Sequence, residues 1–358
     1  MTTRWSYILA TFVLSFQVNA QAIRQQEPKA PYSYEVEEVV FQNTIDGISL
    51  AGTLTYPQKG SDFPAVILIS GSGPQDRNSE LMNHKPFLVI ADHLTKMGIA
   101  VLRVDDRGAG ESEGDYNKSA MSHFVKDTKS ALDFLKTYKK IQSNQIGLIG
   151  HSLGGNIAPI VASEREDIAF IVLLAGSGIR GDQLMLLQKA MIERKMGVPE
   201  VSVAQAQTNM KGAYDIILNS DGKKEELQKQ LNEYFTTKFA GMIPEQQVKT
   251  IAEQMSWPWF VDFIKFDPAP VLQKVDCPVL AINGSNDVQV PAEENLQAIE
   301  KALIAGGNED IQTQVLEKLN HLFQESETGL PNEYATIQQT FSPVALEIIT
   351  DWIEERTK

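Results

Sequence analysis

The sequence predicts an α/β fold with a mostly parallel central sheet, flanked by helices, and an inserted helical segment. Continuous apolar runs such as Ala65–Ile69 and Gln145–Ile149 alternate with helical stretches, and strands that are apolar along their whole length are typically buried on both faces. The alternation stops near Ile179 and resumes at Pro278, which indicates roughly ninety residues of helix between two strands.

The predicted elements follow one another in a regular order. Two strands, Val36–Phe41 and Ile48–Thr55, flank Asp46-Gly47, a dipeptide typical of hairpin turns, and add an antiparallel edge. The later strands are Ala65–Ile69, Ile99–Val104, Gln145–Ile149, Ile168–Leu174, Pro278–Ile282 and Ile311–Leu316. The helices are Pro86–Met97, Met121–Tyr138, Asn156–Glu164 and Val344–Glu355, with Gln183–Lys195 and Lys223–Phe239 inside the insert.

These patterns divide the chain into four segments. Residues 1–20 form an export signal, 21–178 the first part of the sheet domain, 179–267 the helical insert and 268–358 the second part of the sheet domain. An insertion of this length between packed elements is more often a functional lid than a passive loop. We therefore expect the insert to form a helical cap.

The first twenty residues have the pattern of a cleavable signal peptide. Arg4 supplies a positive end, Tyr7–Phe16 a mostly apolar stretch, and Val18-Asn19-Ala20 small residues at the cleavage spacing, so the mature chain would begin at Gln21. The apolar stretch is short for a membrane span, and no cysteine follows it to carry a lipid. The sequence predicts a secreted or periplasmic protein without a stable membrane anchor; a buried N-terminal helix is the alternative.

Composition excludes several classes of function. Of 358 residues, 42% are hydrophobic and 22% charged, as in ordinary globular proteins. The net charge is −14 and basic runs are absent, which argues against nucleic acid as a partner because phosphate contacts need clustered Lys and Arg. The single cysteine, Cys277, permits no intrachain disulfide, and we expect it to be a buried small hydrophobic residue.

The segment Gly150-His151-Ser152-Leu153-Gly154 has the pattern of a nucleophile elbow. Gly-x-Ser-x-Gly alone is weak, since average composition produces it by accident in about one chain in ten of this length. Here a buried strand ends at Gly150 and a helical pattern starts after Ser152, which is the setting the motif requires. The sequence therefore predicts Ser152 as a nucleophile; a glycine-rich turn with an incidental serine is the alternative.

A serine hydroxyl needs a base, and the base needs a carboxylate to orient it. In α/β-hydrolases these residues follow in the order Ser, Asp or Glu, His, and His321 is the only histidine beyond Ser152. We favour Asp287 as the acid because it follows the strand Pro278–Ile282, at the end where such sites form; capping a turn is its alternative role. His151 is expected to pack beside the elbow.

The reaction also needs donors for a tetrahedral oxyanion, and loss of one donor typically costs about 3 kcal/mol of barrier. The backbone N–H of Leu153 is one candidate. The second is expected in the glycine-rich loop after Ala65–Ile69, from Ser72 or, alternatively, Gly73. Metal-ligand spacings are absent from the sequence, and we expect neither a metal nor another cofactor.

Four segments carry a resemblance to a known family: Ser70–Arg77 (SGSGPQDR), Asp105–Ser112 (DDRGAGES), Cys277–Gly284 (CPVLAING) and Asn320–Gln324 (NHLFQ). They resemble secreted bacterial α/β-hydrolases of the carboxylesterase and serine-aminopeptidase-like group, from about residue 36 to the C-terminus and least in the insert. The resemblance implies a carboxylesterase for short-chain acyl esters. Ser70 departs from it, because many such enzymes carry histidine there, and this affects the hydrogen bonding of the loop.

Two other features have more than one interpretation. Asp105-Asp106-Arg107 follows a strand, and we interpret it as an ion-paired turn rather than as catalytic machinery. Trp257, Trp259 and Phe260 form an aromatic cluster where the insert rejoins the sheet domain. They are expected either to line an acyl pocket or to form core that docks the cap.

The leading hypothesis is hydrolysis of a small carboxylic ester through an acyl-Ser152 intermediate. His321 acts as base and then as acid, and Asp287 orients it. The same groups serve equally in a peptidase or aminopeptidase that cleaves amide bonds. A hydrolase-fold binding module without activity is the third hypothesis, which the complete set of site residues disfavours.

Overall fold

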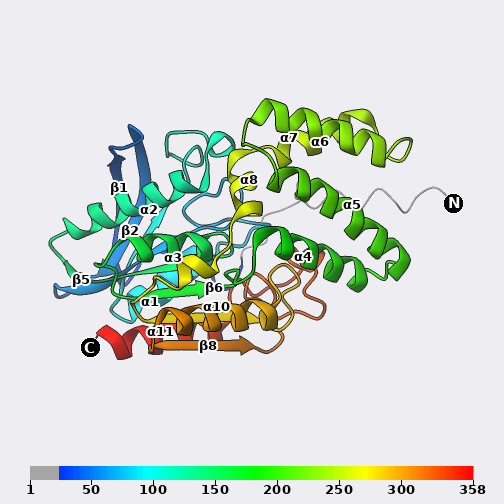
Figure 1. The fold of residues 1–358 in the computed structure, drawn as a ribbon. Coiled ribbons are helices and arrows are strands. Elements are labelled where there is room, and N and C mark those ends of the chain that lie inside the picture. Colours follow the sequence, from blue (N-terminus) through cyan, green and yellow to red (C-terminus); the bar gives the residue numbers. More distant parts are fainter. Residues whose placement is uncertain (1–23, 358) are drawn as a thin grey trace. The chain divides into compact units, whose positions relative to one another are not determined.

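The computed structural model describes residues 24–357, so the predicted export signal lies outside the described residues. The described chain divides into two compact units (Figure 1). One comprises residues 24–179 and 267–357 and contains the sheet; the other is the helical segment Arg180–Phe266.

The sheet has eight strands in the order β1-β2-β4-β3-β5-β6-β7-β8. β1 pairs antiparallel with β2, and β2 pairs antiparallel with β4, while the remaining neighbours are parallel. The predicted mostly parallel sheet with an antiparallel edge is therefore confirmed. The strands are β1 (Tyr34–Asn43), β2 (Ile48–Pro57), β3 (Phe63–Ile69), β4 (Ala100–Val104), β5 (Ile141–His151), β6 (Ile171–Leu174), β7 (Val279–Gly284) and β8 (Ile311–Leu316).

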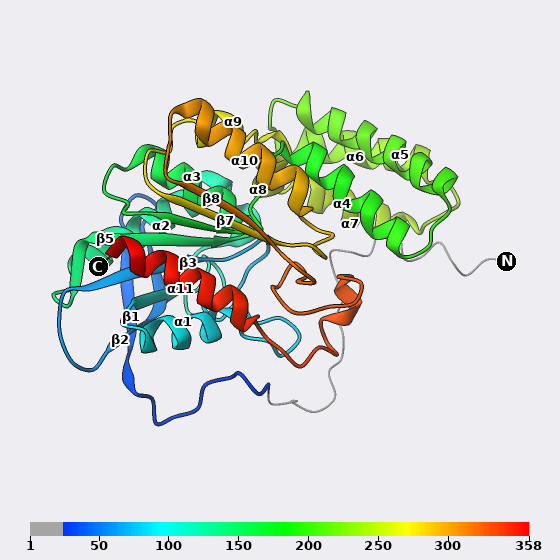
Figure 2. The same cartoon turned by 90° about the horizontal axis from the view of Figure 1, so that it is seen from below.

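Helices cover both faces of the sheet, as the apolar strands require. α1 and α11 contact each other on one face, and α2, α3, α9 and α10 cover the other (Figure 2). Their bounds are α1 (Pro86–Lys96), α2 (Met121–Lys136), α3 (Gly154–Glu164), α9 (Ala269–Leu272), α10 (Ala292–Gly306) and α11 (Pro343–Thr357). Every residue of β6 and β7 is buried, whereas the residues of the edge strand β8 are exposed or partly buried except for Leu316 at its end.

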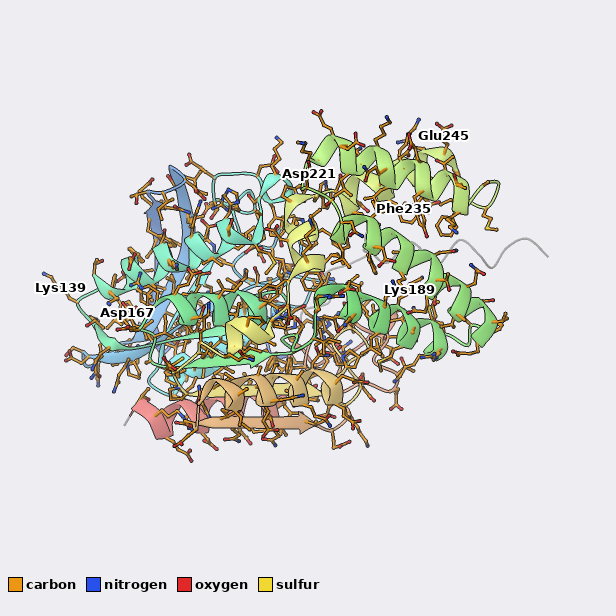
Figure 3. All side chains as sticks on the ribbon, in the orientation of Figure 1. Lys139, Asp167, Lys189, Asp221, Phe235 and Glu245 are labelled. Carbon is orange, nitrogen blue, oxygen red and sulfur yellow. The ribbon has the colours of Figure 1, made fainter. Side chains whose placement is uncertain are left out.

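The helical unit contains α4 (Gly181–Lys195), α5 (Glu200–Leu218), α6 (Lys224–Lys238), α7 (Glu245–Met255) and α8 (Pro258–Lys265). The buried residues of α6, Leu227, Leu231 and Phe235, recur every four positions and so lie on one face (Figure 3 labels Phe235). The Phe235 ring also stacks on Phe239, with centroids 5.8 Å apart. No separate bounds are predicted from the sequence for α5, α7 and α8 of this unit, nor for α9 and α10 of the sheet unit.

Three further findings concern function indirectly. Within residues 24–357 the helices are all too short or too polar to cross a membrane. The same residues contain no group of three His, Cys, Asp or Glu side chains that could hold a metal ion. Cys277 is a free thiol that is partly rather than fully buried, and burial raises its pKa to about 12, so the thiol is protonated at neutral pH.

Candidate active site

Ser152 lies on a sharp turn between β5 and α3. Its backbone is left-handed, with φ 53°, a conformation that costs a non-glycine residue about 1–3 kcal/mol. The Ser152 N–H donates to the carbonyl of Leu174 at the end of β6, at 2.9 Å. The turn is thus strained and anchored to the neighbouring strand, which is the geometry of a nucleophile elbow.

The two glycines of the motif are required by close contacts. A Cβ atom on Gly150 would lie 2.1 Å from the Gly154 carbonyl oxygen, and one on Gly154 would lie 2.2 Å from the carbonyl oxygen of Ile69. Both distances are far inside van der Waals contact with backbone atoms that cannot move aside. The spacing of the sequence motif therefore reflects how tightly the turn packs against β3 and the start of α3.

Asp287 and His321 form a buried pair on the loops after β7 and β8. His321 Nδ1 donates to Asp287 Oδ2 at 2.7 Å, and both side chains are almost fully buried. Asp287 Oδ1 accepts the backbone N–H groups of Gln289 and Val290, at 2.8 and 2.9 Å. Asp287 therefore caps its own turn and also fixes the His321 ring with the Nδ1 proton toward the carboxylate, which leaves Nε2 as the acceptor.

His151 connects the elbow to the loop of His321. Its Nε2–H donates to the His321 carbonyl at 2.8 Å, and the centroids of the His151 and His321 rings are 4.9 Å apart. Burial, reinforced by the nearby His321 ring, lowers the pKa of His151 to about 3, so this ring is neutral. Within residues 24–357, no hydrogen bond joins the Ser152 hydroxyl to His321 Nε2; such bonds often tighten only when substrate is bound.

The glycine-rich loop after β3 lies against the elbow, and we refer to residues 70–77 as the oxyanion loop, after the role that the sequence predicts for it. A Cβ atom on Gly71 would lie 3.3 Å from Ser152 Cβ. The Gly73 N–H donates to the Tyr116 hydroxyl at 2.9 Å and is therefore engaged. In the part of the chain that the structure describes, the N–H groups of Ser72 and Leu153 have no acceptor.

Asp106 binds the oxyanion loop through its side chain and its backbone N–H. It accepts the Ser70 hydroxyl at 2.5 Å and the Gln75 N–H at 2.9 Å, and its own N–H donates to the Gln75 carbonyl at 3.0 Å. Burial raises the pKa of Asp106 to about 7, and the carboxylates of Asp127 and Asp105 add to the shift. The segment is an ion-paired turn at Asp105 and Arg107, as interpreted from the sequence, whereas the Asp106 carboxylate faces loop hydroxyl and amide groups instead.

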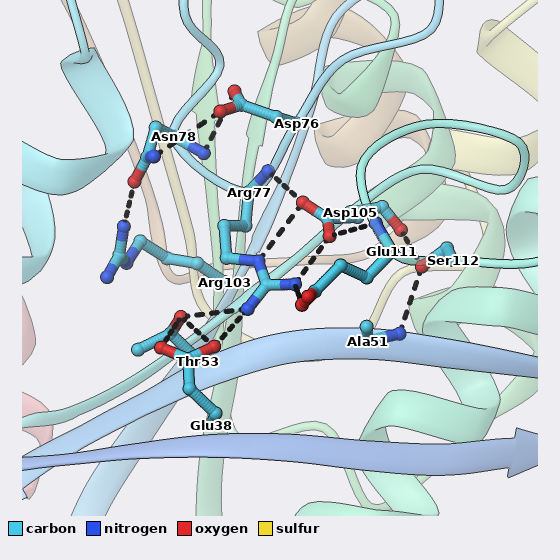
Figure 4. Close-up of polar contacts among 10 residues, drawn as sticks. All are labelled: Glu38, Ala51, Thr53, Asp76, Arg77, Asn78, Arg103, Asp105, Glu111 and Ser112. Carbon is cyan, nitrogen blue, oxygen red and sulfur yellow. Dashed lines mark hydrogen bonds and ion pairs between the residues drawn. The ribbon is translucent and has the colours of Figure 1, made fainter.

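Both neighbours of Asp106 form the predicted ion pairs. Arg77 donates to both oxygens of Asp105 and also contacts Glu38 and Glu111 (Figure 4). These contacts keep the pKa of Asp105 below its ordinary value despite burial. Arg107 pairs with Asp127 and Asp46. The oxyanion loop is thus attached at Ser70 and Gln75 by Asp106 and at Arg77 by Asp105.

The three aromatic residues proposed for an acyl pocket belong to the helical unit. Trp257 precedes α8, and Trp259 and Phe260 lie in its first turn. The centroid of the Trp259 ring lies 6.4 Å from that of Trp257 and 5.7 Å from that of Phe260. Trp259 and Phe260 are buried, and Trp257 is partly buried. They form one cluster within this unit, and their role in substrate binding stays a prediction.

The roles of two residues near the site, Tyr116 and Asp106, are missed by the sequence analysis. Tyr116, in a short 3₁₀ turn, is buried and reaches Gly73, but no motif marks it. Asp106 lies in a segment that the sequence does single out, although with another role. The serine in place of histidine at position 70 is the one signal that pointed to altered bonding in this loop.

The chain is similar to several known proteins. The family model described as serine aminopeptidase, S33, matches residues 85–327, which is more than half of the chain. Esterase EstD from Thermotoga maritima is 27% identical over 310 residues, covering 85% of this chain and 64% of EstD. The chain therefore spans less than two thirds of the length of this curated relative.

Solved structures show the same fold at low identity. The esterase Pf2001 of Pyrococcus furiosus is 18% identical with a TM-score of 0.55, and the match covers 91% of this chain and 92% of that one. The α/β hydrolase GrgF from Penicillium sp. sh18 is 17% identical with a TM-score of 0.57, covering 90% and 99%. The chain has the α/β-hydrolase fold and belongs to the family described as serine aminopeptidase, S33, with esterases among its distant relatives.

Proposed function

We propose that this protein hydrolyses small carboxylic esters with short acyl groups through an acyl-Ser152 intermediate. The observation that carries the proposal is the buried His321–Asp287 pair, with its 2.7 Å hydrogen bond, on loops at the same end of the sheet as the strained Ser152 turn. A base oriented by a carboxylate, together with a serine on a strained turn, is the arrangement that nucleophilic acyl transfer requires. The esterase relatives support an ester substrate.

The proposed reaction has two halves. In the first, His321 Nε2 takes the Ser152 proton as Oγ attacks the ester carbonyl, and the alcohol leaves with that proton. In the second, water attacks the acyl-serine while His321 again removes a proton and returns it to Ser152 Oγ. Asp287 keeps the ring in the tautomer that accepts at Nε2 and stabilises the imidazolium that forms.

We assign the oxyanion contacts to the backbone N–H groups of Leu153 and Ser72. Neither has an acceptor within the described residues, whereas the Gly73 N–H already donates to Tyr116. Leu153 also lies at the start of α3, where the helix dipole favours negative charge. Gly73 remains the alternative donor, to be released if Tyr116 moves.

Cleavage of peptide or amide bonds is the second candidate function, because the matching family is described by an aminopeptidase activity. The two candidates share the nucleophile and differ in the leaving group. A panel of p-nitrophenyl esters of increasing acyl length, run beside aminoacyl p-nitroanilides, separates them. We expect turnover of the short esters and little of the anilides; the reverse pattern would establish the peptidase instead.

The Ser152→Ala variant is the control for both candidates. Loss of a nucleophile of this kind lowers kcat by about 10⁶-fold in well-studied serine hydrolases, leaving only catalysis by binding and oxyanion contacts. Full turnover by Ser152→Ala would refute the mechanism. An inactive wild-type protein against every acyl substrate would favour the binding-module hypothesis.

We further propose that the protein is exported and cleaved after Ala20. The support is the arrangement of Arg4, the apolar stretch and the small residues before Gln21, all of which lie outside the described residues. Expression of the full chain in a Gram-negative host, followed by fractionation and N-terminal sequencing, tests this. A periplasmic protein beginning at Gln21 is expected, and an intact N-terminus in the cytoplasm would contradict it.

A further inference from the structure

Arg24, at the start of the described chain, binds a loop from the other end of the protein. We refer to residues 334–342 as the C-terminal loop. The Arg24 guanidinium donates to the carbonyl of Ile337 at 2.7 Å and that of Ala335 at 3.0 Å, and it also reaches the Met82 carbonyl at 3.1 Å. Arg24 is only 2% exposed, whereas the residues that accept its three bonds are partly exposed or exposed.

Gln26 binds the same loop further along. Its Oε1 accepts the N–H groups of Thr340 and Phe341, at 2.6 and 3.1 Å, and its Nε2 donates to the Phe341 carbonyl at 2.7 Å. A segment without regular structure must find partners for its main-chain groups elsewhere. Arg24 and Gln26 together supply five such partners to the C-terminal loop.

The buried His84 ring binds the same loop at Tyr334 and Thr340. Its Nε2–H donates to the Tyr334 carbonyl at 2.9 Å, and Nδ1 accepts the Thr340 hydroxyl at 3.0 Å. Burial lowers the pKa of His84, and the charge of Arg24 lowers it further. The ring therefore stays neutral and adds no second positive charge beside Arg24.

The C-terminal loop in turn contacts a neighbour of each member of the buried acid–base pair, Phe323 near His321 and Gln289 near Asp287. The Ser342 N–H donates to the carbonyl of Phe323 at 2.7 Å, and the rings of Phe323 and Phe341 stack at 5.3 Å. Phe323 follows His321 by two residues and has a left-handed backbone, with φ 58°. External contacts are needed to hold a phenylalanine in this conformation.

A second connection leads to Asp287. The Tyr334 hydroxyl accepts from Gln289 Nε2 at 2.9 Å, and the Gln289 N–H donates to Asp287 Oδ1 at 2.8 Å. Tyr334 is 2% exposed, so its ring is held within the protein interior. The C-terminal loop therefore supports His321 through its contacts with Phe323, and it supports Asp287 through the hydrogen bond between Tyr334 and Gln289.

We propose that Arg24 and Gln26 are positioning residues for the reaction: by binding the C-terminal loop, they hold His321 and Asp287 in register with Ser152. This inference rests on the proposed function, since it assigns His321 its role as base. Neither residue touches substrate. Both bind the C-terminal loop, at Ile337 and Phe341, which lie more than 300 positions away in the chain and beyond the segment that the family model matches.

The first test separates kcat from KM. A misplacement of about 1 Å in a reacting group can cost up to about 10²-fold in rate. We expect Arg24→Ala and Gln26→Ala each to lower kcat for p-nitrophenyl acetate by about 10-fold or more while KM changes little. Arg24→Lys should fall between them and wild type, because one ammonium cannot reach all three carbonyls.

Gln25→Ala is the matched control. Gln25 lies between the two residues, is exposed, and makes no hydrogen bond within the described residues. It should retain wild-type kcat and KM. Circular dichroism and urea midpoints identify variants that fail to fold; if Arg24→Ala is one of them, Gln26→Ala and Arg24→Lys carry the test.

A double-mutant cycle decides whether the effect passes through the base. In a His321→Ala background, measured at high enzyme concentration with an activated ester, Arg24→Ala and Gln26→Ala should have no further effect on the residual rate. If they lower that rate by the same factor as in wild type, or if they raise KM instead of lowering kcat, the proposal is overturned. Failure of the proposed function is distinct: Ser152→Ala and His321→Ala would then themselves remain active.

Discussion

The oxyanion loop and the loop that carries His321 lie at the same end of the sheet but are held by different chemistry. The oxyanion loop is bound by two buried carboxylates, Asp105 and Asp106, which follow the neighbouring strand β4. The His321 loop is bound by the neutral His151 ring and by a main-chain hydrogen bond and a ring stack from the C-terminal loop. The C-terminal loop is in turn bound by Arg24 and Gln26.

This difference determines how each loop responds to pH. Asp106 has a pKa of about 7, so its charge changes in the neutral range and with it the hold on Ser70 and Gln75. An arginine keeps its charge throughout, and glutamine has none to lose. We therefore expect the oxyanion side of the site to be sensitive to neutral pH through Asp106, whereas Arg24 and Gln26, which bind the C-terminal loop, do not change charge in that range.

The largest effect should come from Asp287→Asn on the base side. The amide oxygen still accepts from Gln289 and Val290, and the amide nitrogen then faces His321 Nδ1. A donor at that position forces the proton onto Nε2, so the ring cannot accept the Ser152 proton. By analogy with the same change in other triads, kcat for p-nitrophenyl acetate should fall by about 10⁴-fold.

Thermal unfolding of Asp287→Asn provides the control, because the turn remains capped and stability should be close to wild type. A variant with near-normal stability and kcat within tenfold of wild type would show that Asp287 does not orient the base.

The next effect concerns stability on the oxyanion side. In the unfolded chain Asp106 titrates near its ordinary pKa of 3.8, and in the folded chain at about 7. Between these values the folded state binds more protons, so the contribution of Asp106 to the free energy of unfolding falls as pH rises, by about 1.4 kcal/mol per pH unit, and levels off above pH 7. Asp106→Asn cannot titrate and should lack this decline.

Urea unfolding of wild type and Asp106→Asn across pH 4 to 8 measures the difference in the free energy of unfolding between the two proteins. The contributions of the other titrating groups are the same in both and cancel in this difference. The variant should gain stability relative to wild type by a few kcal/mol over this range. Parallel curves would show that Asp106 is ionised in the folded state at all these values.

A smaller effect on rate is expected from Asp106→Ala. Loss of the carboxylate frees the Ser70 hydroxyl and the Gln75 N–H on either side of Ser72. The loop keeps its bonds from Arg77 to Asp105, from Gly73 to Tyr116 and from the Asp106 N–H to the Gln75 carbonyl. Removal of a whole oxyanion donor costs about 10²- to 10³-fold in kcat, so displacement of one should cost about 10- to 100-fold. Steady-state kinetics with an unchanged KM would support this, and Asp106→Asn should recover part of the loss.

The smallest effect should be that of Tyr116→Phe, which compares the two candidate donors Ser72 and Gly73. The change removes the acceptor of the Gly73 N–H, a bond worth about 1 kcal/mol, or roughly fivefold. If Ser72 is the donor, kcat should fall by no more than this factor. An increase in kcat would indicate instead that the freed Gly73 N–H binds the oxyanion.

Much of the fold could be predicted because it depends on local patterns. Apolar strands alternating with helices determine a parallel sheet covered on both faces, and the spacing of Gly150, Ser152 and Gly154 determines a strained turn because larger residues would collide with backbone. Chain order then singles out His321 and Asp287 as candidates, and the structure brings these two side chains together.

Tertiary structure alone decided what holds these residues in place. From the sequence, Asp106 is one of several charged residues in a turn. The fold buries its carboxylate against Ser70 and Gln75, and this burial raises its pKa. Arg24 has no motif, and its partners lie 58 to 313 residues away. A sequence records which groups can form hydrogen bonds, but the partners of a buried group are set by the packing of distant segments, and here that packing determines how the candidate base is held.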